Sequence, residues 1–311
     1  MSPNSYQITS SKIKIGTRSS ALALTQAYYI RDCLKIIGNL TDNDFEIIPI
    51  KTTGDKLLTT KLQDLGGKGL FTKEIEQALL NKTIDIAVHS GKDVPTQRQA
   101  GLYIMATPER EDCRDAYISY QYPLLSDLPQ GATLGTASLR RTAQFLYQRP
   151  DLTIVLLRGN VQTRLQKLSD GVCDATILAC AGLNRLKMPH IATQILDIDD
   201  FLPAPAQGAL MIEGHLEMPQ NLKLLINQLN CQDTFDTVTA ERALLSALDG
   251  DCRTPIAAFA KIDGDTIILQ GALLSDDGTK KTHKVTSGLR KNSYELGLEL
   301  GNQIKEAFYK C

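Results

Sequence analysis

The hydrophobic and polar positions of residues 13–90 follow two different periods. Short apolar runs such as "FEIIPIK" are typical of buried strands, whereas apolar residues that recur every three or four positions are typical of a helix. One helical face carries Ala23, Gln26, Ala27, Ile30, Cys33, Leu34 and Ile37. We therefore predict three strands, one that begins at residue 12 and two that span 45–51 and 84–90. We also predict helices through 23–37 and over 70–81, and a long mobile loop over the glycine-rich stretch 52–69.

The same alternation restarts near residue 113. It predicts strands at 133–136, 153–157 and 174–179 and helices at 138–148 and 160–169. Alternating strands and helices imply a parallel or mixed sheet that helices cover. A passage rich in proline and glycine, 202–214, ends in a strand and is a candidate crossing between domains.

The pattern changes after about residue 230. It predicts a helix over 234–248, a hairpin in which Asp-Gly-Asp joins "IAAFAKI" to "TIILQGALL", and a final helix over 292–310. The predicted fold is α/β, with two periplasmic-binding-protein-like lobes that contain mixed sheets and a small C-terminal α+β domain. The expected domains are 1–110, completed by about 209–228, then 111–208, and finally 229–311.

The amino-acid composition argues against several classes of binding partner and site. The 34 Lys and Arg residues nearly balance 35 Asp and Glu residues, so a net charge of −1 provides no overall attraction to nucleic acid or to anionic membranes. We find neither a signal-peptide pattern in residues 1–16 nor an apolar run as long as a membrane span, and therefore expect a cytoplasmic protein. Seven cysteines without a C-x-x-C pair, and four scattered histidines, argue against a disulfide framework or a metal site.

Four predicted strand ends carry similar basic motifs. They read "GTRSSA" (16–21), "HSGKDVP" (89–95), "GTASLRR" (135–141) and "LRGNVQTR" (157–164). A single arginine of this kind is usually a solvated surface charge. Ligands of open α/β sheets, however, bind at the carboxyl ends of strands, and arginine forks match carboxylates. The repeated motif therefore favours a ligand with many carboxylates, and no motif matches a nucleotide-phosphate loop.

Two further residues suggest chemistry. Asp93 is the one carboxylate within these basic motifs, and it either meets a ligand or merely caps a helix or pairs with Lys92. Cys252 lies in "LDGDCRTP", a turn-forming stretch, although cysteine is normally buried. The sequence therefore raises the question of what this sulfur does.

The ordered motifs resemble those of the porphobilinogen deaminase (hydroxymethylbilane synthase) family. They are "GGKGLFTKEIE", "DIAVHSGKDVP", "GTASLRR", "LRGNVQTRL" and "LPAPAQGAL", and the resemblance runs from residue 13 to about 260. It implies a transferase of haem biosynthesis that joins four porphobilinogen molecules head to tail, with release of ammonia, to give hydroxymethylbilane. It also implies a monomer that passes its product to uroporphyrinogen III synthase.

The resemblance assigns roles to residues at matching positions. Asp93 would assist departure of the amine and stabilise the cationic pyrrole, while Cys252 would hold a dipyrromethane cofactor through a thioether. The other cofactor-binding residues would be Lys92, Asp93 itself, Ser138, Arg140 and Arg141. Substrate-binding residues would be Arg18, Ser20, Gln26, Lys68, Arg158, Arg164, Arg185 and Gln207. Each pyrrole carries an acetate and a propionate, which accounts for the arginines.

Several positions depart from the family pattern, namely Gly91, Cys113, Ala137, Ala206 and Asp251. None of them removes an acid, an arginine or the cofactor cysteine. The main alternative function is a non-catalytic carboxylate-binding protein of the periplasmic-binding-protein type, which needs neither Asp93 nor Cys252. A cysteine hydrolase is a weaker alternative, because no histidine is near Cys252 in the sequence.

Overall fold

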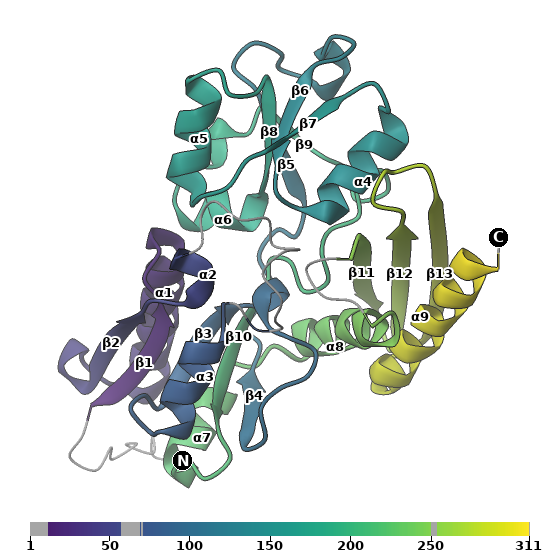
Figure 1. The fold of residues 1–311 in the computed structure, drawn as a ribbon. Helices are drawn as coiled ribbons and strands as arrows, with labels where there is room; N and C mark the ends of the chain where they lie inside the picture. The colour runs from purple at the N-terminus through teal and green to yellow at the C-terminus, as the bar shows by residue number, and fades with distance from the viewer. Residues whose placement is uncertain (1–11, 57–68, 70, 250–253, 311) are drawn as a thin grey trace. The chain divides into compact units, whose positions relative to one another are not determined.

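The structure is a computed structural model that describes residues 12–56, 69, 71–249 and 254–310. Its contacts group the chain into two compact units (Figure 1). The first unit comprises the described residues up to 56, Gly69–Arg110 and Ala209–Phe235. The second comprises Glu111–Gly208 and the described residues from Asp236 onward.

The first unit contains a five-stranded mixed sheet. Its order is β2-β1-β3-β10-β4, in which β1 is parallel to β2 and β3, and β10 is antiparallel to both neighbours. The strands are β1 (Ile13–Arg18), β2 (Phe45–Ile50), β3 (Ile86–Ser90), β4 (Leu102–Ala106) and β10 (Leu210–His215). Since β1 and β3 are parallel, their carboxyl ends, Arg18 and Ser90, lie at the same edge of the sheet.

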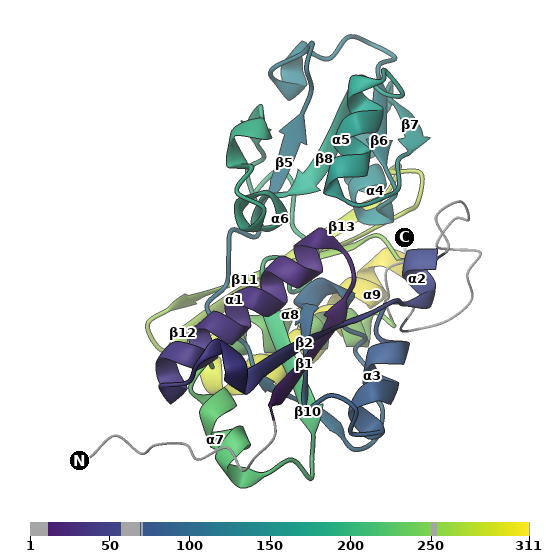
Figure 2. The ribbon, with the colours of Figure 1, turned by 90° about the vertical axis from the view of Figure 1, so that its left-hand side faces the viewer.

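Helices cover both faces of this sheet (Figure 2). They are α1 (Ala21–Gly38), α2 (Thr53–Lys56), α3 (Lys73–Leu80) and α7 (Gln220–Asn227), with short 3-10 turns η1 (Asp42–Asp44) and η2 (Gly91–Asp93). Successive β3 residues point to opposite faces. Ile86 and Val88 therefore pack in one apolar cluster with Ile30 of α1, whereas Ala87 packs in another with Ile75 of α3.

The second unit repeats this strand order. Its five-stranded sheet runs β7-β6-β8-β5-β9, with β6 parallel to β7 and β8, and β5 antiparallel to both neighbours. The elements are β5 (Asp115–Ile118), β6 (Thr133–Thr136), β7 (Thr153–Leu156), β8 (Ala175–Ala179), β9 (Gln194–Ile195), η3 (Leu125–Asp127), α4 (Leu139–Gln148), α5 (Val161–Ser169), α6 (Cys180–Arg185) and η4 (Pro189–Ile191). In each sheet the antiparallel fourth strand lies close to a point where the chain passes between units.

The C-terminal part of the second unit has its own antiparallel sheet, ordered β11-β12-β13. The elements are α8 (Gln232–Ala247), which begins in the first unit, β11 (Ile256–Asp263), β12 (Thr266–Leu274), β13 (Lys281–Leu289), η5 (Arg290–Asn292) and α9 (Ser293–Tyr309). Leu244 of α8 and Ile304 of α9 share an apolar cluster with this sheet. Gly297 permits close packing of the two helices, because a Cβ there would lie 2.2 Å from the Ala240 carbonyl oxygen.

The observed elements confirm the predicted fold class of two mixed α/β sheets and a small C-terminal α+β part. Helix α2 lies inside the stretch predicted as a loop, and the rest of that stretch, 57–68, is outside the described residues. The sequence did not predict β4, β5, β9, β13, α6 or α7. The division into three domains stays a prediction. No helix among the described residues is long and apolar enough to span a membrane.

Three ionisable side chains are buried together in the first unit. His89 Nε2 lies 3.2 Å from Glu213 Oε2, and these two side chains are 4% and 1% exposed. Glu76 of α3 lies near both. Burial raises the pKa of the Glu76 carboxyl, and the Glu213 carboxylate raises this pKa further, whereas the nearby Thr72 and His89 side chains oppose the change.

We predict that Glu76→Gln stabilises the protein at pH 8 but not at pH 4. The raised pKa means that ionisation of Glu76 disfavours the folded state, so wild-type stability falls relative to the variant as pH rises through that pKa. Below the ordinary glutamate pKa both states are protonated and this difference vanishes. Urea unfolding at both pH values measures it. Glu217→Gln is the control and should show the opposite trend, because a hydrogen bond from Lys82 lowers the Glu217 pKa; matching trends would exclude the burial effect.

Candidate active site

The edge of the first sheet brings together two residues that the sequence singled out. Arg18 ends β1, and Asp93 ends the η2 turn that follows β3. The turn is fixed by a hydrogen bond from Gly91 N to Ala209 O at 2.9 Å. Arg18 Nη1 lies 3.5 Å from Asp93 Oδ2, and the two side chains are 25% and 32% exposed. The ion pair is therefore partly open to solvent, as a site for a ligand requires.

Arg18 also contacts an aromatic ring. Its guanidinium carbon lies 4.3 Å from the centre of the Phe71 ring. Guanidinium groups are attracted to the faces of aromatic rings, and stacking limits the orientations of the fork. Phe71 and Asp93 together therefore orient Arg18.

The remaining first-unit candidates differ in environment. Gln26 is buried, and its Nε2 donates to Ser90 Oγ at 3.0 Å. Ser20 is half-buried and caps α1, because its Oγ accepts a hydrogen bond from Ala23 N at 3.3 Å. Lys92 is exposed on the η2 turn beside Asp93. Ser90 thus connects the helix α1 to the edge that bears Asp93.

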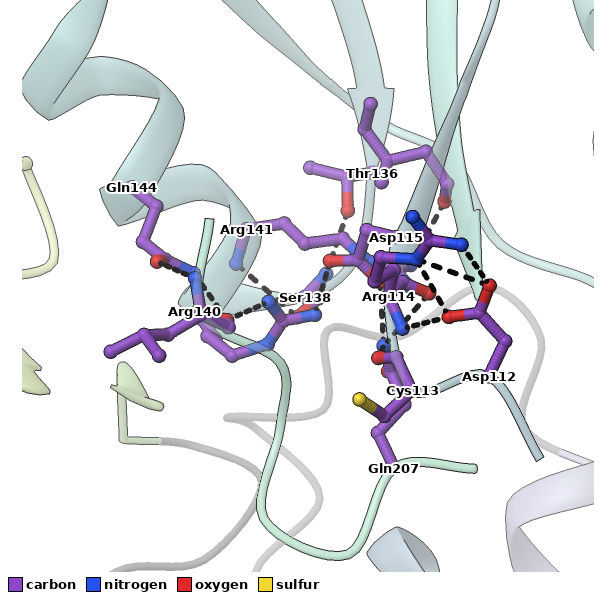
Figure 3. Close-up of polar contacts among 12 residues, drawn as sticks. Asp112, Cys113, Arg114, Asp115, Thr136, Ser138, Arg140, Arg141, Gln144 and Gln207 are labelled. Atoms are coloured by element: carbon purple, nitrogen blue, oxygen red, sulfur yellow. Dashed lines mark hydrogen bonds and ion pairs between the residues drawn. The ribbon is translucent and has the colours of Figure 1, made fainter. Parts of the chain in front are cut away.

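In the second unit, Asp115 connects several candidate residues (Figure 3). It begins β5, beside the carboxyl end of β8, where Asp115 pairs with Ala179. Arg140 Nη2 donates to its Oδ2 at 2.7 Å, and Arg141 Nη2 donates to its Oδ1 at 2.7 Å. Gln207 Nε2 donates to Oδ1 at 2.8 Å. One carboxylate therefore holds side chains from α4 and from the segment before β10.

The electrostatics of this cluster explain why the buried charges are tolerated. Burial by itself would raise the pKa of the Asp115 carboxyl, but the adjacent Arg140 and Arg141 guanidinium groups hold this pKa well below its usual range. The carboxylate is therefore ionised, and together with the two arginines it leaves a net charge of one positive unit.

Ser138 caps α4, because its Oγ accepts a hydrogen bond from Arg141 N at 3.4 Å.

The motif that contains Arg158 and Arg164 forms a compact turn before α5. Gly159 has a φ of +125°, and a Cβ there would lie 2.7 Å from the Thr163 side chain, so the turn requires glycine. Arg164 Nε donates to Gly159 O at 2.8 Å, and Asn160 caps α5 by accepting from Thr163 N at 2.8 Å. Both arginines are half-buried; Arg158 follows the carboxyl end of β7, and Arg164 lies on α5.

Arg185 contacts the segment that carries Gln207. Its Nη2 donates to Gly208 O at 2.7 Å. Ala206, one of the departures from the family pattern, has a φ of +62°, a conformation that favours glycine. Its backbone N–H donates to the buried Glu241 carboxylate at 2.7 Å, which helps to hold this conformation.

Cys252, Lys68 and Asp251 lie outside the described residues, so their roles stay predictions. The structure describes five cysteines, none of which forms a disulfide with another of them: Cys33, Cys113, Cys173, Cys180 and Cys231. The part of the chain that the structure describes contains no group of three or more metal-ligating side chains.

Sequence reasoning missed Asp115, Phe71 and Ser90. Asp115 precedes "AYI", an apolar run of only three residues that is a weak strand signal, and the strand itself was not predicted. Without β5 there was no reason to place this carboxylate beside α4. Phe71 was visible in "GGKGLFTKEIE", but its contact with Arg18 depends on the packing of distant segments.

Comparisons with known proteins cover nearly the whole chain. Residues 13–222 match the model of the porphobilinogen deaminase, dipyromethane cofactor binding domain, and residues 235–306 match the model of the porphobilinogen deaminase C-terminal domain. The porphobilinogen deaminase of Paracoccus denitrificans (strain Pd 1222) is 48% identical over 293 residues, which cover 94% of this chain and 93% of the relative. That of Nitrobacter winogradskyi is 47% identical over 292 residues, which cover 94% and 92%.

Similarity to solved structures is much more distant. The Bordetella pertussis BvgS periplasmic VFT2 domain aligns with a TM-score of 0.40 and 16% identity, over 70% of this chain and 86% of that chain. This level of similarity supports no argument about ligand or function. The two family models and the two close relatives do, and the chain belongs to the porphobilinogen deaminase family.

Proposed function

We propose that Asp93 carries the chemistry of a hydroxymethylbilane synthase, and the observation that supports this is its partly open ion pair with Arg18 at the edge of the first sheet. The enzyme is a transferase of haem biosynthesis that joins four porphobilinogen molecules head to tail and releases ammonia each time. The carboxylate-binding alternative is not favoured, because the family models and both relatives are those of porphobilinogen deaminases.

Asp93 suits two demands of this reaction. The amine leaves with the electron pair of its bond to carbon, so its nitrogen needs a proton, and a cation remains on the pyrrole ring. A protonated Asp93 carboxyl can assist amine departure, and the carboxylate can then accept the pyrrole N–H and stabilise the cation. Arg18 lies on one side of this carboxylate and would bind a carboxylate of the substrate.

The second-unit cluster fits a dipyrromethane group, which has four carboxylates. Arg140 uses two of its nitrogens for Leu202 O and Asp115, and its buried Nε has no partner among the described residues. Such an orphaned donor next to a net positive charge suits an anion. We assign cofactor binding to Arg140, Arg141, Ser138, Lys92 and Asp93 and covalent attachment to Cys252. The bound group would supply the free pyrrole carbon to which the first substrate unit is joined.

The substrate and the growing chain are assigned to the remaining residues at positions that match the family motifs. These are Arg18, Ser20, Gln26, Lys68, Arg158, Arg164, Arg185 and Gln207. Arg18, Arg158, Arg164 and Arg185 are partly accessible or half-buried, whereas Gln26 and Gln207 are buried. The two glutamines would therefore act mainly by holding neighbouring side chains. We further propose a cytoplasmic monomer that passes its product to uroporphyrinogen III synthase.

The function is tested on purified protein. Intact mass should exceed the polypeptide by two pyrrole units, Ehrlich's reagent should colour the protein, and added porphobilinogen should release ammonia and give a linear tetrapyrrole. A bare polypeptide that binds porphobilinogen without ammonia release would instead support the carboxylate-binding alternative.

We predict that Arg18→Leu loads cofactor normally but turns over at least about tenfold more slowly. Loss of one charge-assisted hydrogen bond removes about 1.5–3 kcal/mol of interaction with each incoming carboxylate. Native mass spectrometry should show enzyme that carries partial chains. Arg31→Leu is a control, because Arg31 of α1 has a similarly exposed side chain, at 24%, and pairs with Asp32 and Asp42. Equal mass distributions and rates for the two variants would refute the role of Arg18.

A further inference from the structure

We propose that Asp115 is a positioning residue of this reaction, which fixes the side chains of Arg140, Arg141 and Gln207 in the arrangement that receives the carboxylates of the pyrrole chain. The proposal rests on the proposed function, which assigns these three residues to cofactor and substrate. The Asp115 side chain is 1% exposed and so acts through its neighbours.

Both oxygens of the Asp115 carboxylate accept hydrogen bonds from the residues that Asp115 would position. Its Oδ1 accepts from Arg141 Nη2 at 2.7 Å and from Gln207 Nε2 at 2.8 Å. Its Oδ2 accepts from Arg140 Nη2 at 2.7 Å and from Arg141 Nε at 3.2 Å. Four donors match the four lone-pair positions of an ionised carboxylate. Each donor belongs to an assigned site residue, which separates Asp115 from a carboxylate that only supports the backbone.

Backbone carbonyls complete the arrangement. Arg140 Nη1 donates to Leu202 O at 2.6 Å, and Arg141 Nη1 donates to Ile177 O at 2.8 Å. Each guanidinium is thus held at two points, by Asp115 on one side and by a carbonyl on the other. A planar fork held in this way has a fixed direction for its remaining N–H donors. Those donors include the buried Arg140 Nε, which has no partner among the described residues.

The charges of the cluster set its affinity for anions. Two guanidinium groups and one carboxylate leave one net positive charge in a site where Arg140 and Arg141 are 5% and 6% exposed. Without Asp115, two unpaired cations would repel each other at low dielectric and would reorient toward solvent. Asp115 therefore keeps both arginines in place while leaving enough positive charge to attract a ligand carboxylate.

A purely structural role for Asp115 makes a different prediction. If the carboxylate only stabilised the fold, a variant would unfold more easily, but the molecules that remain folded would still load cofactor. If Asp115 positions the arginines, folded molecules themselves should fail to load. The fraction of folded protein that carries the mass of two pyrrole units separates the two roles.

The experiment uses the full chain with Asp115→Asn, which keeps the shape of the side chain and removes its charge. Folded monodisperse protein is collected, and its intact mass is measured. We expect the loaded fraction to fall at least tenfold. Asp115→Glu keeps the charge and so retains the fold if the asparagine variant is unstable; its carboxylate is displaced by one methylene, and we expect at least a threefold loss of loading. Wild-type loading in folded protein of either variant would overturn the proposal.

Asp174→Asn is the matched control. Asp174 lies at the opposite end of the same sheet, where its carboxylate accepts from Thr133 N at 2.7 Å and Thr133 Oγ1 at 2.6 Å. The Asp174→Asn variant should have a lower melting temperature but unchanged cofactor loading. If this variant lost loading as Asp115→Asn does, Asp115 would have only a structural role. Wild-type protein and Cys252→Ser, measured alongside, report on the proposed function independently of the Asp115 variants.

Discussion

Cys252→Ser should give a folded protein with the mass of the bare polypeptide and a turnover at least about a thousandfold below wild type. Thiolates are far better nucleophiles than the serine hydroxyl, so the substitution removes the atom that would form the thioether. Helix α8 ends at Ala247 and strand β11 begins at Ile256. Cys252 therefore belongs to the short segment of the sequence that connects α8 to β11. A thousandfold loss corresponds to about 4 kcal/mol.

Other cysteines provide the controls for this experiment. Burial raises the pKa of the Cys180 thiol to about 12, so this sulfur stays protonated and unreactive. Cys231 is half-buried and precedes α8. Cys180→Ala and Cys231→Ala should therefore load cofactor as wild type does. Retention of the extra mass and of turnover in Cys252→Ser would show that the cofactor is attached elsewhere.

The parts of the fold that the sequence predicted best are those with strong local signals. Helices α4 and α5 begin immediately after Ser138 and Asn160, whose side chains accept from backbone N–H groups of the first turn. By contrast, β13 reads "KTHKVTSGL" and has only half-buried and exposed side chains. Strand β9 has two residues. Strands of this kind are defined by pairing with a neighbour, which local periodicity does not encode.

The candidate site shows the same division. The basic strand-end motifs singled out Arg18 and Asp93 in the first unit and Arg140 and Arg141 in the second, because topology brings the carboxyl ends of parallel strands to one edge of each sheet. The strand-end motifs did not predict which side chains form ion pairs with these residues. Arg140 and Arg141 pair with Asp115, which lies 25 and 26 positions earlier in the chain. Asp93 pairs with Arg18 at 3.5 Å. Such pairs depend on antiparallel pairing and turn geometry that the sequence pattern left open.

Asp93→Asn should slow ammonia release in cofactor-loaded enzyme by roughly a hundred- to a thousandfold, which corresponds to about 3–4 kcal/mol. Asparagine keeps the size of the side chain and can still accept a hydrogen bond. It has neither the negative charge that stabilises the cationic pyrrole nor a proton that it can donate to the departing amine. It would also lose the charge that faces Arg18, whose Nη1 lies 3.5 Å from Asp93 Oδ2. Single-turnover measurement separates this chemical step from cofactor assembly.

Two further substitutions decide whether the effect belongs to the chemistry. Asp93→Glu keeps charge and proton but moves the carboxyl by one methylene, so slow turnover and long-lived chain intermediates are expected. Asp85→Asn is the structural control, because Asp85 precedes β3 at the other end of the strand and its carboxylate accepts from Lys14 N at 2.7 Å. It should leave ammonia release unchanged. Wild-type release by Asp93→Asn together with impaired release by Asp93→Glu would make Asp93 a spacer, and the proton donor would then be another group near the edge of the first sheet.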